Sequence, residues 1–481
     1  MSPQAFATTL ALIGVVILVA ALLSGLIERI RMPQVALFIL LGLVLGPFGL
    51  GLISFTAESA VLRTVAILGL VLVLFTDAVS VDLAEVRRHR NLALLVLGPG
   101  TLLSAAAIGV AGWALLDLPP AAAAILGAAL ASTDPVMMRG LLRRSDVPSA
   151  ARQALGMESG LNDAVALPIV LAAMTFLGPG RSEAATGWGR LALDLFVLGP
   201  AGGVLVGLIG VALLDLVRRR VGVRRDYESL YALGVAFTAF AVAEAAHGSG
   251  FLAAFAAGLT VAAFDTELCD CFLDYGQATA EMFLLFTFVA LGSSAIWSGL
   301  RVLDGRTLVF AGVALFLRSA VLYPALAGAG LDPQSRRLIT WFGPRGLSSL
   351  LLVLLPLFAG VPGSERLVAV ASLVVLLSVV VHGGSLMLIG RGGALMNQGA
   401  AAPGTLSTAP ATNGIRISLA ELRRLEEQRE AVVLIDVRTT RGYEKSASQA
   451  RGAVRLPPDN AAPRAAELAL PRHAWLVAYC A

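Results

Sequence analysis

The sequence predicts an all-α polytopic membrane protein followed by a small, partial α/β domain. Composition is the first observation: 57% of the 481 residues are hydrophobic and only 14% are charged, whereas an ordinary soluble domain has roughly 25% charged residues. The second is a series of apolar stretches long enough to cross a bilayer as helices, separated by short Arg-containing loops. The third is an abrupt change of character after Arg391, where a Gly/Ala/Pro/Thr-rich segment begins.

Thirteen transmembrane helices are expected in the first part of the chain. A helix of about 20 apolar residues covers the roughly 30 Å of hydrocarbon in a bilayer. Stretches of suitable length lie at residues 6–27, 33–52, 61–79, 91–115, 119–141, 151–177, 190–217, 228–247, 249–264, 278–298, 307–327, 334–358 and 364–390. The ninth is short, and only HGSG at 247–250 separates it from the eighth.

Arginine residues are concentrated in the loops after odd-numbered helices, for example RRHR at 87–90 and RRRVGVRR at 218–225. Because basic residues are enriched in cytoplasmic loops, we expect a multi-pass protein of the cell (inner) membrane with its N-terminus outside and its C-terminus in the cytoplasm. The net charge of +4 therefore reflects membrane orientation, and no nucleic-acid partner is expected.

Polar residues interrupt the sixth apolar stretch, at MESGLNDAVALP, residues 157–168. An ionised carboxylate at the centre of a membrane helix costs at least about 2.5 to 3.5 kcal/mol, so such a group normally faces a cavity or a partner and has a function. Ser159 and Asp163 are four residues apart and share one helix face, while Glu158 and Asn162 share the adjacent face. One face is suited to holding an ion, and the other to bracing it.

The fifth helix, ILGAALASTDPVMMRGLL, contains a break signal. Pro135 has no N–H and disfavours helical geometry at Asp134, so the backbone at Ser132, Thr133 and Asp134 should be unwound. Unwound backbone inside a membrane offers free carbonyl oxygens to a cation.

The twelfth helix, LITWFGPRGLSSLLLVLL, contains a second break, in which Gly343, Pro344 and Gly346 surround Arg345. Helices 5 and 12 are seven apart in the series, as expected of two six-helix inverted repeats separated by one linking helix. Paired broken helices at matching places in two repeats indicate the substrate site of a secondary transporter. Asp134 and Arg345 would then meet near the middle of the membrane.

These motifs resemble the cation:proton antiporter family, in its sodium/proton exchanger branch. The resemblance covers about residues 5–390 and rests on STDP at 132–135, ESGLNDA at 158–164, GPRG at 343–346 and the stretches LFTDAVSVDL, EAAHGSGFLAAFAAGL and FTFVALG. It implies a thirteen-helix fold with a dimerisation part and a mobile core part, a crossing of helices 5 and 12, and a homodimer surrounded by membrane lipid.

The resemblance also implies the ion-binding residues. Asp163 is expected to bind either a cation or a proton, Ser159 and the Thr133 carbonyl to add oxygens to a sodium site, and Asp134 to line that site. Asp77, at the acidic position of LFTDA, is expected to contribute through water, although alanine follows it here in place of the usual glycine.

Four further residues are expected to support the core. By the resemblance, Asn162 fixes the crossing region and Glu158 pairs with Arg345. Arg318, within VALFLRSAVLYPA, resembles another family arginine that braces the core.

Antiport follows from the chemistry of a single carboxylate. A proton and a sodium ion compete for the oxygens of Asp163, and a core that moves only when Asp163 is occupied exchanges one for the other without ATP or any cofactor. Because Asn162 is neutral and Glu158 is expected to be paired, one sodium ion should move for each proton, without net charge. A role in pH homeostasis follows. Potassium/proton exchange is the alternative, lithium is a further candidate, and no residue pattern decides among these cations.

The remaining chain is expected to form a flexible linker at 392–414 and a soluble domain at 415–481, beyond a transmembrane domain at 1–391. LIDVRTTRGYEKSASQARGAVRLPPDN and WLVAYC resemble a rhodanese-like (sulfurtransferase) domain, with Cys480 at the nucleophile position. The chain ends one residue later, without the loop that would activate the thiol, so catalysis is not expected. A membrane-anchored sulfurtransferase or redox sensor is the competing function, but an anchor needs one helix and no buried charges. The expected protein is a transporter and not an enzyme.

Overall fold

The chain consists of two compact units, Met1–Asn397 and Gln398–Ala481, which are described separately. The computed structural model describes residues 34–53, 59–142, 147–177, 188–221, 225–264, 270–385, 430–437, 452–456 and 474–479, together with isolated positions between these ranges. The predicted domain boundaries at 391 and 414 stay predictions, because residues 386–421 lie outside the described residues.

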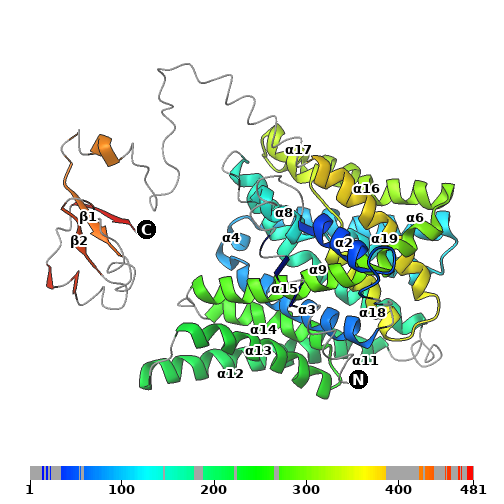
Figure 1. Cartoon of the computed structure of the whole chain (residues 1–481), viewed down its shortest axis with the longest axis horizontal. Coiled ribbons are helices and arrows are strands. Elements are labelled where there is room, and N and C mark those ends of the chain that lie inside the picture. The colour runs from blue at the N-terminus through cyan, green and yellow to red at the C-terminus, as the bar shows by residue number, and fades with distance from the viewer. Residues whose placement is uncertain are drawn as a thin grey trace. The chain divides into compact units, whose positions relative to one another are not determined.

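The first unit is helical (Figure 1). Its α-helices are α2 (Gln34–Leu45), α3 (Ala60–Ser80), α4 (Leu83–Arg88), α5 (Arg90–Leu97), α6 (Ser104–Leu116), α7 (Pro120–Ala131), α8 (Pro135–Leu142), α9 (Ser149–Leu177), α11 (Trp188–Leu193), α12 (Gly199–Arg220), α13 (Arg225–Ala245), α14 (Gly250–Phe264), α15 (Asp270–Ser293), α16 (Gly305–Ala325), α17 (Pro333–Trp341), α18 (Leu347–Phe358) and α19 (Ser364–Ser378). Tighter or wider helical segments are η1 (Gly98–Leu103), η2 (Asp194–Leu198), η3 (Ala295–Val302), η4 (Leu326–Gly328) and η5 (Val379–Gly383).

Several helices have the length and composition of membrane spans. Within the described part of the chain, six are long and apolar enough to cross a bilayer, and a seventh is obtained if Leu285–Ser293 and Ala295–Val302, bent by 50°, form one span. Five shorter apolar helices accompany them: Val35–Leu45, Pro120–Ala131, Leu230–Ala245, Gly250–Phe264 and Leu347–Phe358. The total of thirteen stays a prediction, because most of the first expected span, 6–27, is not described. The predicted boundary between the eighth and ninth helices at HGSG is confirmed, since α13 ends at Ala245 and α14 begins at Gly250.

Close helix packing depends on small residues. Helices α12, α13 and α14 lie side by side, and α14 also packs against α3 (Figure 1). At Gly203 of α12 an added Cβ would overlap the carbonyl group of Ala253 in α14, so only glycine permits this approach. Membrane helices commonly pack through such small residues, because lipid provides no hydrophobic driving force between them.

Both predicted helix breaks are present. Helix α7 ends at Ala131 and α8 begins at Pro135, while α17 ends at Trp341 and α18 begins at Leu347. The two breaks touch, since the backbone N–H of Asp134 donates to the carbonyl of Pro344 at 2.9 Å. The two unwound segments therefore satisfy part of each other's backbone hydrogen bonding inside the core.

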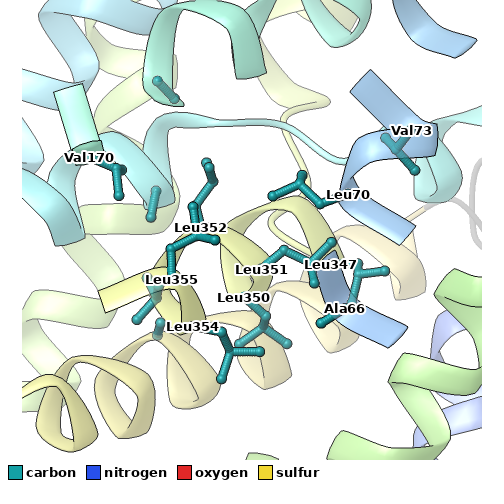
Figure 2. Close-up of a cluster of buried hydrophobic side chains, with 14 of the residues drawn as sticks. Ala66, Leu70, Val73, Val170, Leu347, Leu350, Leu351, Leu352, Leu354 and Leu355 are labelled. Atoms are coloured by element: carbon teal, nitrogen blue, oxygen red, sulfur yellow. The ribbon is translucent and has the colours of Figure 1, made fainter. Parts of the chain in front are cut away.

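The second half of the later broken helix lies in a dense apolar core. Figure 2 shows leucines of α18 packed among Ala66, Leu70 and Val73 of α3 and Val170 of α9, all of them buried. Burial on all sides fixes the start of α18, at Leu347, relative to the carboxylate-bearing helix α9. The break is thus held in a well-packed frame.

In the second unit, the described strands form a parallel sheet of order β2-β1-β3. The strands are β1 (Val432–Asp436), β2 (Val454–Arg455) and β3 (Trp475–Tyr479), and β1 and β3 overlap the stretches LIDVR and WLVAYC on which the rhodanese-like resemblance rests. Buried Asp436 accepts a hydrogen bond from the Tyr479 hydroxyl at 3.0 Å. In the described sheet β3 pairs with β1 alone and exposes Trp475. Cys480 lies outside the described residues.

Candidate ion-binding site

Each helix break carries a charge that stabilises the other break. The ends of a helix have unpaired backbone groups and partial charges, positive at the N-terminus and negative at the C-terminus. Arg345 donates from Nη1 to the carbonyls of Ala131 and Ser132 at the C-terminal end of α7, at 2.8 and 3.3 Å. Asp134 accepts from the N–H of Leu347, the first residue of α18, at 2.7 Å. The two side chains therefore cap half-helices across the crossing.

Glu158 pairs with Arg318. The Arg318 Nε and Nη2 atoms donate to the two carboxylate oxygens of Glu158 at 2.8 and 2.5 Å, and both side chains are almost completely buried. The predicted pairing of Glu158 with Arg345 is therefore wrong. Arg345 lies close enough to act electrostatically on the pair, but its hydrogen bonds go to the end of α7.

Arg318 also stabilises the second break. Its Nη1 donates to the carbonyls of Ile339 and Thr340, near the C-terminal end of α17, at 3.0 and 3.1 Å. Gly343 lies directly against the arginine side chain, where a Cβ would approach Arg318 to 2.9 Å. One guanidinium group thus joins α16, α9 and the end of α17, which supports the bracing role predicted for Arg318.

Asp163 is a buried carboxylate with one oxygen that has no hydrogen-bond partner among the described residues. It lies on α9 and is only 3% exposed. Its Oδ1 accepts a short hydrogen bond from the Ser132 hydroxyl of the first break, and Ser348 of α18 lies next to the carboxylate. Its Oδ2 has no hydrogen-bond partner among the described residues. A buried carboxylate oxygen without a partner is costly, and a cation or a proton would remove that cost.

Asn162 fastens α9 to the first break. Its amide Nδ2 donates to both oxygens of Thr133, at 2.9 Å to the carbonyl and 2.7 Å to the hydroxyl. The neighbouring residues on both segments, Asp163 and Ser132, are joined in the same way. Two adjacent contacts hold the unwound backbone against α9, and this geometry supports the predicted role of Asn162.

Ser159 and Asp77 lie on the helices beside the site. The Ser159 hydroxyl, one turn before Asp163, donates to the Gly156 carbonyl at 3.2 Å. Asp77 is half-buried on α3, where a Cβ on Gly160 of α9 would lie 3.8 Å from its carbonyl oxygen. Their predicted contributions to ion binding stay predictions.

Most of the chain matches the model of one protein family. The family model described as "Sodium/hydrogen exchanger, transmembrane" matches residues 14–391. The chain belongs to this family. It is 27% identical over 393 residues to the K(+)/H(+) antiporter NhaP of Alkalimonas amylolytica, covering 81% of this chain and 67% of that protein. It is 28% identical over 376 residues to the K(+)/H(+) antiporter NhaP2 of Shewanella sp. (strain MR-4), covering 78% of this chain and 65% of that protein.

A solved structure shows the same fold. The sodium proton antiporter MjNhaP1 from Methanocaldococcus jannaschii at pH 8 superimposes with a TM-score of 0.65 at 18% identity, covering 80% of this chain and 100% of that one. This exchanger-family chain is therefore a helical polytopic membrane protein. The relatives named here are cation/proton antiporters, which are secondary transporters and not enzymes.

The exchanger core holds an excess of one carboxylate. Among the described residues of the helical unit, the buried carboxylate and guanidinium side chains are Asp134, Glu158, Asp163, Arg318 and Arg345. Three carboxylates against two guanidinium groups leave one negative charge when all are ionised. Glu158 is paired with Arg318 and Asp134 accepts the N–H of Leu347, whereas Asp163 keeps one oxygen without a hydrogen-bond partner among the described residues.

Sequence reasoning missed the hydroxyl groups of this exchanger site. Ser132 was expected only to be unwound, yet its hydroxyl binds Asp163, and Ser348 lies next to the same carboxylate. Ser378 accepts the backbone N–H of Arg345 at 2.7 Å. Their places in the sequence could have indicated this role, because Ser132 lies in the break motif STDP and Ser348 lies in the break motif GPRGLSS.

Proposed function

We propose that the protein exchanges sodium ions for protons across the membrane and that Asp163 binds either of the two. The observation that carries this proposal is the buried Asp163 carboxylate, which has one oxygen bound to Ser132 and one oxygen without a partner in the described structure. Family membership supports it. The chain spans about two thirds of the length of the curated relatives it matches. Cation/proton exchange like theirs is therefore proposed for this chain.

The oxygens around Asp163 suit a hard cation. Sodium, like other hard cations, prefers carboxylate, carbonyl and hydroxyl ligands. The broken segment brings the Ser132 hydroxyl to the carboxylate and the Thr133 carbonyl to the adjacent Asn162. Ser159, on the same face of α9, adds a further hydroxyl after a change of rotamer. A proton on the same carboxylate competes directly with the cation.

The single excess negative charge explains obligatory exchange. With Asp163 empty, the core carries an uncompensated buried charge, whose transfer through a low-dielectric region is costly. With a monovalent cation or a proton bound, the core is neutral. Movement is therefore favoured only in the two loaded states, so one sodium ion is exchanged for one proton without net charge transfer.

Potassium is the second candidate cation. The relatives from Alkalimonas and Shewanella are named K(+)/H(+) antiporters. Sodium, potassium and lithium all accept oxygen ligands, so the same carboxylate serves any of them. Their different sizes are expected to decide which of them competes best with the proton.

The remaining features of the proposal concern assembly and location. We propose a homodimer in the cell membrane, in contact with lipid, with thirteen spans in inverted repeats, the N-terminus outside and the C-terminal unit in the cytoplasm, serving pH homeostasis. The parallel sheet of that unit, with buried Asp436 at the end of β1, supports a rhodanese-like domain. We assign this domain no sulfurtransferase activity.

The test uses purified full-length protein in liposomes loaded with a pH-sensitive dye. Adding sodium, potassium or lithium to wild-type protein should collapse an imposed pH gradient, and the order of half-saturating concentrations gives the cation preference. Asp163→Asn keeps the side-chain volume but removes the proton site and the charge, so exchange should disappear. The control is Asp215→Asn, in an exposed pair with Arg219 on α12, which should exchange normally. Cation-driven proton flux in a folded Asp163→Asn variant would refute the assignment.

A further inference from the structure

The end of α19 contains a buried histidine in a widened helical turn. Ser364–Ser378 is α-helical, whereas Val379–Gly383 (η5) is π-helical. Such π segments are rare and are frequent at functional sites. His382 lies in this segment, is only 2% exposed, and places its Nδ1 atom 3.1 Å from the Ser378 hydroxyl.

Ser378 connects this histidine to the second helix break. Its hydroxyl oxygen accepts the backbone N–H of Arg345 at 2.7 Å. The hydroxyl has one hydrogen, which remains available for donation to Nδ1 of a neutral imidazole. A neutral ring also adds no third positive charge beside Arg345 and Arg318, the charged groups that act on it electrostatically. The ring of Trp341, at the end of α17, contacts the His382 ring with their centroids 5.9 Å apart and their planes tilted by 49°.

The contacts continue from Arg345 to the candidate ion site. The Arg345 guanidinium donates to the Ala131 and Ser132 carbonyls, and the Ser132 hydroxyl donates to Asp163. Successive hydrogen bonds, joined through the covalent frames of Arg345 and Ser132, therefore link His382 and Ser378 to Asp163.

We propose that Ser378 and His382 are positioning residues for the cation site: His382 orients the Ser378 hydroxyl, which holds the Arg345 backbone and thereby the Ser132–Asp163 contact. This proposal rests on the proposed function of Asp163. Neither residue contacts the cation. Removing either one should weaken cation binding more than it slows the maximal turnover, because the loaded core is unchanged in charge.

The same segment contains a matched control. Ser385 accepts a hydrogen bond from the indole Nε1 of Trp341 at 3.1 Å and donates to the His382 carbonyl at 2.8 Å. It therefore ties α17 to the same end of α19, but through Trp341 and not through Arg345. Ser385→Ala loosens the segment without breaking the chain to Asp163.

The experiment compares five proteins in liposomes: wild type, Ser378→Ala, His382→Ala, His382→Asn and Ser385→Ala. Ser378→Ala and His382→Ala should each raise the half-saturating cation concentration about ten-fold, the effect of losing one buried hydrogen bond, with the maximal rate within about two-fold. His382→Asn should restore the wild-type value, because its amide oxygen can accept where Nδ1 does. Ser385→Ala should change neither quantity. An unshifted Ser378→Ala, an unrescued His382→Asn or an equal shift in Ser385→Ala overturns the proposal.

A second measurement is independent of transport. Hydrogen exchange followed by mass spectrometry on the full chain reports protection of the segment Phe342–Leu347, which contains the Arg345 amide. Ser378→Ala and His382→Ala should each accelerate exchange in this segment at least ten-fold relative to Ser385→Ala. If the variants show this pattern but the wild type shows no cation-driven flux, the proposed function fails while the positioning contacts stand. Unchanged protection in His382→Ala refutes the positioning role.

Discussion

Arg318 and Glu158 face each other in a two-point ion pair that is sealed from solvent, with the arginine also bound to the end of α17. Removal of one partner from a buried pair leaves an uncompensated charge, whereas removal of both often costs much less. The contact therefore predicts an asymmetry between single and double substitutions.

Glu158→Gln should destabilise the protein by about 3 to 5 kcal/mol, because it strands the Arg318 charge. Adding Arg318→Met should recover part of this loss, while adding Arg345→Met should not, since Arg345 binds the α7 carbonyls. The stability of the wild type, of Glu158→Gln and of the two double variants is measured by thermal unfolding in detergent. Asp215→Asn, in the exposed pair with Arg219, is the control and should change stability by less than about 1 kcal/mol. Rescue by the Arg345 change alone would reverse the assignment of partners.

Gly346→Ala should abolish folding or exchange, because an added Cβ would overlap the Asp134 carboxylate at the start of α18. Gly312→Ala is the matched control on α16, where an added Cβ has nothing within 4 Å. Size-exclusion profiles and cation-driven proton flux are compared for both. Wild-type behaviour of Gly346→Ala would mean that the Asp134 cap is not required.

Exchange should be insensitive to membrane voltage. If Asp163 is the only carboxylate that changes its occupant, no net charge crosses the membrane, and a voltage worth about 2.3 kcal/mol per charge per 100 mV has no effect on the equilibrium. The measurement finds the sodium gradient that stops proton movement at several potassium/valinomycin potentials. A sodium-free series shows whether potassium itself drives proton movement. A stopping point that moves with voltage would require a second titrating group, for which Asp134 is the first candidate.

Deletion of residues 392–481 should leave exchange intact, because the contacts of the candidate site among the described residues lie between Ala131 and His382. The truncated and full-length proteins are compared in the same liposome assay, after matching their amounts in the membrane. Lost exchange in a well-folded truncation would show that the C-terminal unit is required for transport.

The sequence predicted the breaks and the buried acid because both have local causes. Pro135 and the Gly343/Pro344/Gly346 cluster disrupt backbone geometry wherever the helices pack, and a carboxylate such as Asp163 is exceptional in any apolar helix. These features are readable from a few neighbouring residues. Their positions in the structure agree with the prediction to within a few residues.

The partner of Glu158 could not be inferred from neighbouring residues in the sequence. Both Arg318 and Arg345 are buried in the same core. Helix packing brings Arg318 of α16 to Glu158 on α9, whereas Arg345, in the second break, points to the end of α7. The role of Asp134 was hidden for the same reason, because its hydrogen-bond partner, the N–H of Leu347, is 213 positions away. Charge type is visible in a sequence, but the choice among equally charged partners depends on three-dimensional distance.

The contact between position 134 and position 346 also limits the order in which substitutions can accumulate during evolution. The carboxylate of Asp134 occupies the space that a side chain at Gly346 would need, and it binds the N–H of the next residue, Leu347. A lineage can enlarge position 346 only after position 134 has become smaller, and each single step passes through a damaged protein. In a genetic screen the two sites should therefore behave as an epistatic pair, with second-site suppressors of Gly346→Ala arising at codon 134.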